Sequence, residues 1–478
     1  MSTTARSASG EVVARPPVRG YFASVTLRIE DVRPEVILDS PPSGVRGFWQ
    51  SGPHWIAYVG SAAEIDGRTW PGRGPAGSVP DVFGRVEAEA ERLFAEPWTL
   101  DLDGEGRRPR LHGGFAFDLT RPRTDGDPGF WEPYPVARFV LPAIEVEADG
   151  TGARLTVTRR FEHGTSRDRA VDELRRRAGR VREALCEVER SGATPGPVPA
   201  ATAIEEPVGP DQWRGAIDRI LVEIARGAIR KVVLARPLDV TLAGAPDAAA
   251  VLAALRSNNP LAHTFLIQFE RDRFFLGAAP ELIGALEGRR FRTMAVAGST
   301  PRGADPESDE WLGRQLLSSR KNLVEQRIVV EDIAEHLAMP GTTVVEIPDP
   351  ELLRLPRIQH LRTVLVAEVA EDAHVLGLVR ALHPTAAVCG YPREAARDIL
   401  REEEPIERGW YAGPVGWFDD RGNGEFAPAL RSAVGRGPLL RLYAGAGIVE
   451  GSRPRAEWDE TRVKFQTMFH ALDISRVP

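Results

Sequence analysis

Cysteine is almost absent from this chain of 478 residues, which contains only Cys186 and Cys389. Two thiols cannot build the disulfide framework that holds small secreted domains together, and they cannot form a four-cysteine zinc site. The sequence also lacks any run of about 18 uninterrupted apolar residues, the length that a membrane-spanning helix needs. We therefore expect a protein of the reducing cytoplasm that has no transmembrane segment.

A strong excess of charge of either sign is also missing. The chain has 61 Lys and Arg against 68 Asp and Glu, a net charge of −7. So mild a balance gives no overall electrostatic reason to bind nucleic acid or an anionic membrane. Hydrophobic residues make up 42% and charged residues 27% of the chain, as in ordinary globular proteins. We expect a globular protein without nucleic-acid or membrane partners.

The first half of the chain contains short apolar runs bounded by Gly, Pro and Asp, a pattern typical of strands and turns. Residues 1–20 are polar, lack the apolar stretch of a secretory signal, and are expected to form a flexible tail. A helix is expected after Ser166, and the segment 191–199 (SGATPGPVP) interrupts the pattern. This predicts an N-terminal half at 21–200 and a catalytic region at 201–478. The expected strands of the first half lie at 21–29, 48–58, 113–117, 137–144 and 154–157.

Hairpins dominate the second half. They are expected at 264–277, 282–296 and 411–433, followed by a strand at 439–443 and a helix at 453–472. Antiparallel hairpins that outnumber βαβ units favour an α+β fold. Gly445 and Gly447 superficially resemble a dinucleotide fingerprint, but Glu450 stands at the third glycine position and no βαβ unit surrounds them. A tight turn or a close backbone approach is the favoured interpretation.

The last predicted helix offers charged residues at a regular spacing. Glu457, Glu460 and Lys464 fall on one face, because they are three and four residues apart. Such a face could present two carboxylates to a hard cation such as Mg²⁺. From the spacing alone, a solvated charged face is the favoured alternative.

Several ordered blocks of the second half resemble the chorismate-utilising enzymes, the family of the isochorismate, salicylate, anthranilate and aminodeoxychorismate synthases. The resemblance covers more than half of the chain. It implies an α+β fold with one large two-layer sandwich of antiparallel β-sheets, helices packed outside, and both halves of the chain contributing. The blocks are 231–236 (KVVLAR), 277–283 (GAAPELI), 297–303 (AGSTPRG), 359–363 (QHLRT), 382–393 (LHPTAAVCGYPR), 411–417 (YAGPVGW), 424–432 (GEFAPALRS), 443–449 (YAGAGIV) and 457–464 (EWDETRVK).

Within this family, the resemblance implies an enzyme with isochorismate synthase activity, which isomerises chorismate by adding water at C2 and expelling the C4 hydroxyl. Lys231 matches the base of the members that use water, and it must be neutral to accept a proton. Glu281 matches the general acid, which must be protonated and therefore buried. Outside these blocks, an isolated surface lysine and an edge-strand glutamate would be the favoured interpretations.

The resemblance also implies a binding set and a Mg²⁺ cofactor. Glu325 and Glu460 match the glutamates that hold Mg²⁺, and Glu457 matches a neighbour that helps through water. The run 319–326 (SRKNLVEQ) departs from the denser charged run that is usual around the first of these glutamates. The implied substrate-binding residues are Tyr411 and Arg431 at the enolpyruvyl carboxylate, the backbone of Gly445 and Gly447, Lys464, Ser299 and His383.

Other activities remain open at this point. A salicylate synthase would use the same acid and base and then eliminate pyruvate. An ammonia-using synthase would need an amidotransferase, but such members lack the lysine at position 231, so no amidotransferase partner is expected. A non-catalytic relative is disfavoured because every expected position is filled. The sequence does not distinguish a role in menaquinone biosynthesis from one in siderophore biosynthesis.

Overall fold

The structure is a computed structural model that describes residues 20–39, 44–70, 81–102, 108–120, 129–192, 194–405 and 407–475. The expected tail at 1–20 lies outside the described residues, apart from Gly20. The helices are α1 Pro34–Leu38, α2 Val82–Phe94, α3 Arg167–Ser191, α4 Pro210–Ala225, α5 Ala248–Asn258, α6 Pro306–Ser318, α7 Arg320–Leu337, α8 Val375–Leu382, α9 Arg393–Glu403 and α10 Pro454–Ala471, with a 3₁₀ turn at Gly67–Thr69.

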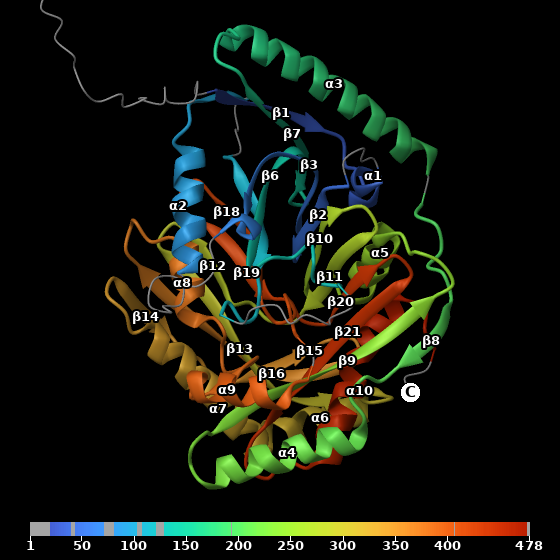
Figure 1. Ribbon diagram of the computed structural model, residues 1–478, viewed down its shortest axis with the longest axis vertical. Helices are drawn as coiled ribbons and strands as arrows, with labels where there is room; N and C mark the ends of the chain where they lie inside the picture. Colours follow the sequence, from blue (N-terminus) through green and yellow to red (C-terminus); the bar gives the residue numbers. More distant parts are fainter. Residues whose placement is uncertain are drawn as a thin grey trace, which may run out of the picture.

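The strands occur between these helices, singly or in runs of two to four, over the described part of the chain (Figure 1). They are β1 Tyr21–Ile29, β2 Arg46–Ser51, β3 His54–Asp66, β4 Trp98–Leu102, β5 Arg110–Phe115, β6 Ala137–Ala148, β7 Ala153–Phe161, β8 Ala201–Glu205, β9 Lys231–Leu242, β10 His263–Glu270, β11 Arg273–Ala279, β12 Gly284–Glu287, β13 Arg290–Pro301, β14 Thr342–Glu346, β15 Glu351–Arg354, β16 Ile358–Val369, β17 Gly390–Tyr391, β18 Pro414–Asp419, β19 Gly424–Pro428, β20 Ser432–Arg436 and β21 Leu439–Ile448.

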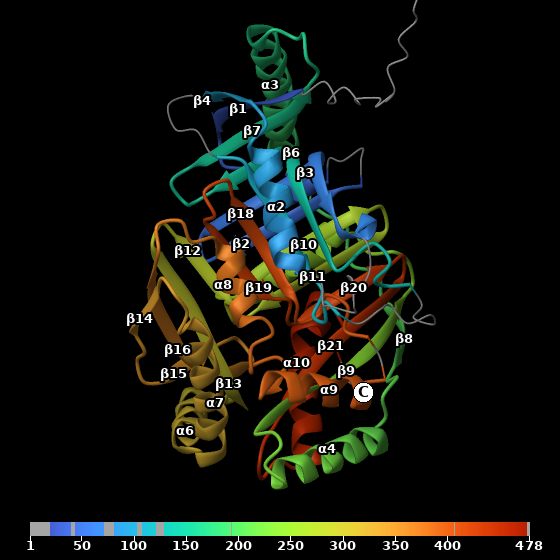
Figure 2. The same cartoon turned by 60° about the vertical axis from the view of Figure 1, so that its left-hand side comes forward.

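The strands form one connected network, in which the long strand β6 pairs with β3, β5 and β7. Two long antiparallel arms start at β3 and β5, and a short branch runs from β7 to β1 and β4. The first arm runs from β6 through β3, β2, β10, β11, β20 and β21 to β9. The second runs from β6 through β5, β18, β19, β12 and β13 to β16. Figure 2 shows β12–β16 on the left and β9 and β21 on the right. Strands from both halves of the chain pair in each arm, so the segment 191–199 joins two parts of one sandwich.

Three clusters of buried side chains hold the layers together. One cluster lies between the arms and combines Phe265, Phe275 and Tyr443 of the first arm with Val415 and Ala427 of the second. The outer face of the first arm packs against α1, α5 and α10, and α3 covers β1 and β7 in the same cluster. The outer face of the second arm packs against α2, α7 and α8. The α+β sandwich with external helices, expected from the resemblance, is confirmed.

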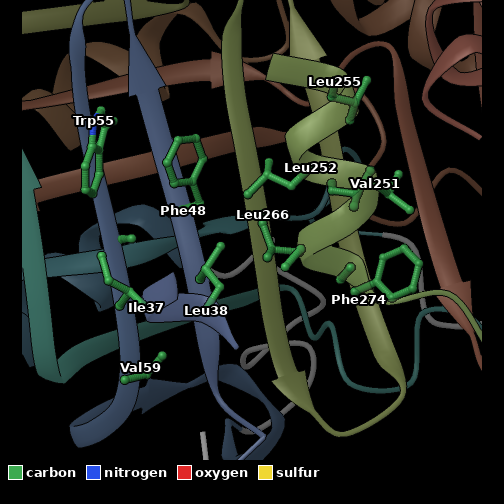
Figure 3. Close-up of a cluster of buried hydrophobic side chains, with 14 of the residues drawn as sticks. Ile37, Leu38, Phe48, Trp55, Val59, Val251, Leu252, Leu255, Leu266 and Phe274 are labelled. Atoms are coloured by element: carbon green, nitrogen blue, oxygen red, sulfur yellow. The ribbon is translucent and has the colours of Figure 1, made fainter. Parts of the chain in front are cut away.

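The α5 contact shows how the outer clusters form. Val251, Leu252 and Leu255 lie on one helical face because they are spaced at one, three and four residues. Figure 3 shows this face against Leu266 and Phe274 of strands β10 and β11, with Phe48 and Trp55 on the neighbouring strands. Burial of these apolar groups fixes the helix on the sheet.

Most elements expected from the sequence are present, with a few informative differences. The run 48–58 was expected as one strand, but it is a hairpin, because Gly52 adopts φ +59° and turns the chain. Ser319 separates α6 from α7 by capping α7, where its hydroxyl accepts from the backbone amide of Asn322. The last strand continues beyond residue 443 to Ile448 because it pairs with β9 along its whole length. Among the described helices, none is both long and apolar enough to cross a membrane.

Candidate active site

A cavity of about 650 Å³, counting the part that opens to solvent, lies where the two arms converge. Strands β9 and β21 supply one wall, and β13 and β16 supply the opposite wall. Helices α7 and α10 contribute Glu325, Glu460 and Lys464. Loops add Glu281 after β11, Tyr411 before β18 and Arg431 between β19 and β20. Residues far apart in the sequence thus meet in one polar cavity.

Glu281 is a buried acid that faces this cavity. Its side chain is only 2% exposed, and among the described residues no group lies within hydrogen-bonding distance of its Oε1 atom. Burial raises its pKa to about 8, although the charges of Lys231 and Lys464 act in the opposite direction. At neutral pH the carboxyl group is therefore protonated and has a proton to donate.

Lys231 begins strand β9 and contacts Glu325, which lines the cavity, although Lys231 itself is not among the lining residues. Its Nζ atom lies 3.2 Å from Glu325 Oε1 and is almost completely buried. Gly447 covers this pair, since a Cβ atom added to it would lie 2.2 Å from Glu325 Oε1 and 3.0 Å from Lys231 Cε. Glycine is required there because no other side chain leaves room for both groups.

The register between β21 and β9 directs backbone groups into the cavity. Gly445 stands opposite Ala235, and Gly447 stands opposite Val233. The amides of Ala235 and Val233 donate away from β21, to Glu404 and to the carbonyl of Cys389. The two residue pairs are therefore non-hydrogen-bonded pairs of the antiparallel ladder. In such pairs the residues of both strands direct their amides away from the other strand, so the amides of Gly445 and Gly447 point away from β9. The amides of the two glycines can thus serve a ligand in the cavity, as the sequence predicts.

The three glutamates expected to hold a metal lie around one lysine. Among the described residues, no three His, Cys, Asp or Glu side chains form a metal-binding group by themselves. Burial alone would lower the pKa of Lys321, but the charge and hydrogen bond of Glu457, with Glu325 and Glu460 nearby, raise it. The Nζ atom of Lys321 lies 2.5 Å from Glu457 Oε1. The three glutamates thus stabilise a positive charge at this place. Their carboxylate oxygens are the kind of ligand that Mg²⁺ prefers.

Two of these glutamates are placed to contact a cation in the cavity, and the third is not. Glu325 and Glu460 line the cavity, whereas Glu457 is 1% exposed and faces Lys321. Burial would raise the pKa of Glu460, but the Lys464 ammonium, 2.6 Å away, holds it below its ordinary value. Glu460 is therefore an anion at neutral pH. Mg²⁺ often takes only one or two carboxylates and completes its shell with water and substrate, so this donor set fits it.

The cavity wall also holds a phenol and a guanidinium. Tyr411 stacks on Tyr443 with ring centroids 4.8 Å apart, and burial raises its pKa to about 12. Burial lowers the pKa of Arg431 to about 10, which leaves it charged at neutral pH. Arg431 adopts φ +49° and Ala412, also in the wall, adopts φ +62°. Such backbone is uncommon outside glycine and frequently accompanies functional sites.

Of the two expected polar residues that remain, one lies at the cavity and the other does not. Ser299 lines it, and its Oγ atom lies 2.9 Å from His360 Nδ1. His383 does not line it: its Nε2 atom contacts the carbonyl of Phe117 at 3.0 Å, between aromatic rings. Burial lowers its pKa to about 3. The structure places His383 as a neutral structural histidine rather than as a substrate contact.

Two groups at the site escaped prediction from the sequence. Lys321 precedes Glu325 by one helical turn, a spacing that could have revealed it as a member of the charged cluster. The buried ion pair of Arg408 with Glu404 supports β9 from behind, through bonds to the carbonyl of Val233 and the amide of Ala235. No sequence pattern indicates that this pair would contact β9.

Comparisons with known proteins agree on a single family. Residues 14–473 match the family model described as chorismate binding enzyme. The chain is 33% identical to isochorismate synthase MenF of Bacillus subtilis over 431 residues, which cover 90% of this chain and 88% of that protein. It is 37% identical to the salicylate biosynthesis isochorismate synthase of Pseudomonas aeruginosa over 405 residues, which cover 81% and 80% of the two chains.

A solved structure extends this similarity to the whole fold. The menaquinone-specific isochorismate synthase MenF of Escherichia coli superimposes with a TM-score of 0.75 and 27% sequence identity. The superposition covers 96% of each chain. The similarity therefore extends over both halves of the chain.

Proposed function

Because the chain belongs to the family of chorismate-binding enzymes, we propose that it is an isochorismate synthase, which isomerises chorismate to isochorismate with Mg²⁺ as cofactor. The observation that carries the proposal is a protonated acid at the cavity together with a buried lysine that contacts the cavity residue Glu325. Glu281 has a pKa of about 8 and an unpartnered oxygen, and Lys231 lies close enough to influence that pKa.

The two residues have complementary roles in the proposed reaction. Lys231 accepts a proton from the water that attacks C2 of the ring, and it must be neutral to do so. The ring double bonds shift, and Glu281 donates its proton to the C4 hydroxyl, which leaves as water. One water enters and one leaves, so the reaction is an isomerisation. A positioned acid and base each contribute roughly 10²–10⁴-fold to such a rate.

The remaining groups match a substrate with two carboxylates. Arg431 and the hydroxyl of Tyr411 offer donors for the enolpyruvyl carboxylate. Glu325 and Glu460 would hold Mg²⁺, and the metal would supply positive charge to the ring carboxylate. The amides of Gly445 and Gly447 and the ammonium of Lys464 add further donors in the same cavity.

The proposal includes a cytoplasmic enzyme that acts without an amidotransferase subunit. Lys231 occupies the position where a base for water is needed, and an ammonia-using synthase has no need of it. The names of the relatives refer to menaquinone and to salicylate biosynthesis, so either pathway could consume the product of this enzyme.

One assay tests the proposed function directly. Purified protein is incubated with chorismate and Mg²⁺, with and without ammonium, and the products are separated by chromatography. We expect isochorismate under both conditions and no amino product. Salicylate and pyruvate in equal, enzyme-dependent amounts would show a salicylate synthase instead. An aminated product that requires ammonium would show that the proposed nucleophile is wrong.

A further inference from the structure

A chain of three polar side chains crosses the wall of the cavity at strands β13 and β16. Ser299 and His360 stand directly opposite each other in this antiparallel pair, next to an irregularity at Gly298, which has φ +71°. Ser299 Oγ lies 2.9 Å from His360 Nδ1, and His360 Nε2 lies 3.1 Å from Arg431 Nη2. All three residues line the cavity.

The chemistry of these groups determines which nitrogen of His360 carries the proton. A guanidinium can only donate, so Arg431 donates to Nε2, and Nε2 has no hydrogen. The proton of the neutral ring is then on Nδ1, which donates to Ser299.

The environment keeps the ring neutral. His360 is 3% exposed, and burial, followed by the charges of Arg431 and Lys464, lowers its pKa well below the ordinary value. A protonated ring would carry a hydrogen on Nε2 directed at the guanidinium, which has no acceptor. Both ring nitrogens are thus occupied by hydrogen bonds of fixed direction.

We propose that His360 is a positioning residue whose Nδ1–H tautomer, set by Arg431, makes Ser299 a hydrogen-bond donor toward the substrate. Because Ser299 Oγ accepts a hydrogen bond from His360 Nδ1–H, its own hydrogen cannot point at the ring and is free to point into the cavity. The same contact holds the Arg431 guanidinium in place. The ligand oxygen that this hydroxyl serves is a carboxylate or ether oxygen, which accepts but does not donate. His360 holds its proton and does not transfer it.

The inference rests on the proposed function for the identity of the ligand, but the tautomer can be measured without turnover. In protein labelled with ¹⁵N-histidine, His360 should show a protonated Nδ1 and an unprotonated Nε2, without titration between pH 5.5 and 9. The signal is assigned by its loss in His360→Gln. A proton on Nε2, or a titration in this range, would overturn the proposal whether or not chorismate is turned over.

A double-mutant cycle tests the connection to Ser299. Ser299→Ala should lower kcat/KM for chorismate about tenfold in the wild-type background, a size typical of one lost hydrogen bond. In the His360→Phe background, where the hydroxyl is no longer directed, the same change should cost less than about twofold. In the His360→Gln background the amide can accept from Arg431 and donate to Ser299, so the cost should return.

Controls separate positioning from a structural effect. His470→Gln alters an exposed histidine of α10 whose Nδ1 atom contacts the carbonyl of Gln466, one turn earlier in the same helix, and it should leave kcat/KM unchanged. Thermal unfolding of His360→Phe and Ser299→Ala shows whether each remains folded. An equal cost of Ser299→Ala in all three backgrounds would show that the two side chains act independently, and the proposal would be wrong.

Discussion

The Lys231 Nζ atom lies 3.2 Å from Glu325 Oε1, and the bare backbone of Gly447 closes this contact on one side. Gly447→Ala would place a methyl group 2.2 Å from the Glu325 carboxylate, so that the carboxylate and the lysine must both move. We expect kcat to fall by about 10² or more, the usual contribution of a positioned base. Steady-state kinetics with chorismate measures the effect.

The matched control is Gly179→Ala, on the remote helix α3, where an added Cβ meets no atom within 4 Å. It should leave kcat unchanged and should stabilise the protein by about 0.5–1 kcal/mol, because alanine is the better helix former. Equal kinetics for the two alanine variants would show that the space over the contact between Lys231 and Glu325 is unimportant.

The protonation of Glu281 predicts how activity depends on pH. The group donates a proton only while it is protonated, and its pKa is about 8. The rate in the direction of isochorismate should therefore decrease as the pH rises through about 8. A pH–rate profile of kcat/KM measures this limb, and a limb near pH 4.5, the ordinary value, would contradict the assignment.

The same shift predicts a dependence of stability on pH. The pKa of Glu281 rises from 4.5 to about 8 on folding, so the folded state binds the proton more tightly between these values. Its contribution to stability is complete below pH 4.5 and is lost as the pH rises to about 8, at up to about 1.4 kcal/mol per pH unit. Glu281→Gln cannot ionise, so its free energy of unfolding should decrease less across this window, as denaturant titrations would show.

From the position of Lys321 among the three glutamates, we predict how stability and affinity respond to Mg²⁺. Mg²⁺ at 100 times its Kd should raise the free energy of unfolding by about 2.7 kcal/mol, and Glu460→Ala should abolish this gain. Lys321→Ala removes a positive charge that competes with the metal, so Mg²⁺ should bind several-fold to about tenfold more tightly. Calorimetric titration with Mg²⁺ measures the affinity without substrate.

Arg320→Ala is the control for this effect, since it removes a charge from the exposed neighbouring position. Its Mg²⁺ affinity should stay within twofold of the wild type. Weaker binding in Lys321→Ala would mean that this lysine supports the metal site rather than competes with it. Full activity in excess chelator would remove the metal from the proposed function.

A substitution in the cluster between α5 and the first arm should change stability without changing the reaction rate. Leu252 of α5 is completely buried against β10 and β11, remote from the cavity lining (Figure 3). Leu252→Ala should lower the free energy of unfolding by about 2–5 kcal/mol, while kcat and KM at 25 °C remain within twofold. A large loss of kcat in a folded variant would mean that the α5 contact shapes the cavity.

Sequence patterns predicted the elements whose periodicity is local. The helix after Ser166 is present, and the Ser166 hydroxyl caps it by accepting from the amide of Arg169. The second-half hairpins are present as well, although Arg431, with φ +49°, ends the third one and starts a separate strand, β20. Sequence patterns did not predict strand ends that depend on an unusual backbone conformation or on pairing with a strand far away in the sequence. The extension of β21 through Gly445 and Gly447 depends on β9 rather than on strand propensity.

For the site, most of the expected residues came from the family resemblance rather than from their spacing. The spacing of Glu457, Glu460 and Lys464 alone favoured a solvated face, yet this face of α10 lies against the cavity and the Lys321 ion pair. His383 was misplaced because its block resembles a family block, and only the tertiary structure shows its ring directed at Phe117. Contacts between strands, such as that of Ser299 with His360, have no signature in one sequence.

The strictest prediction concerns Lys231, because the proposed reaction is reversible. In the forward direction this lysine takes a proton from water and Glu281 donates one, and in the reverse direction the two exchange roles. Lys231→Ala should therefore reduce the rates from chorismate and from isochorismate by the same factor, about 10²–10⁴, and leave the equilibrium ratio unchanged. Binding should change only a few-fold, since Arg431 and the backbone of Gly445 and Gly447 are retained. Initial rates measured from both sides provide the test, with circular dichroism to confirm that the variant is folded. Near-normal turnover in both directions would mean that Lys231 only neutralises Glu325 and that another group activates the water.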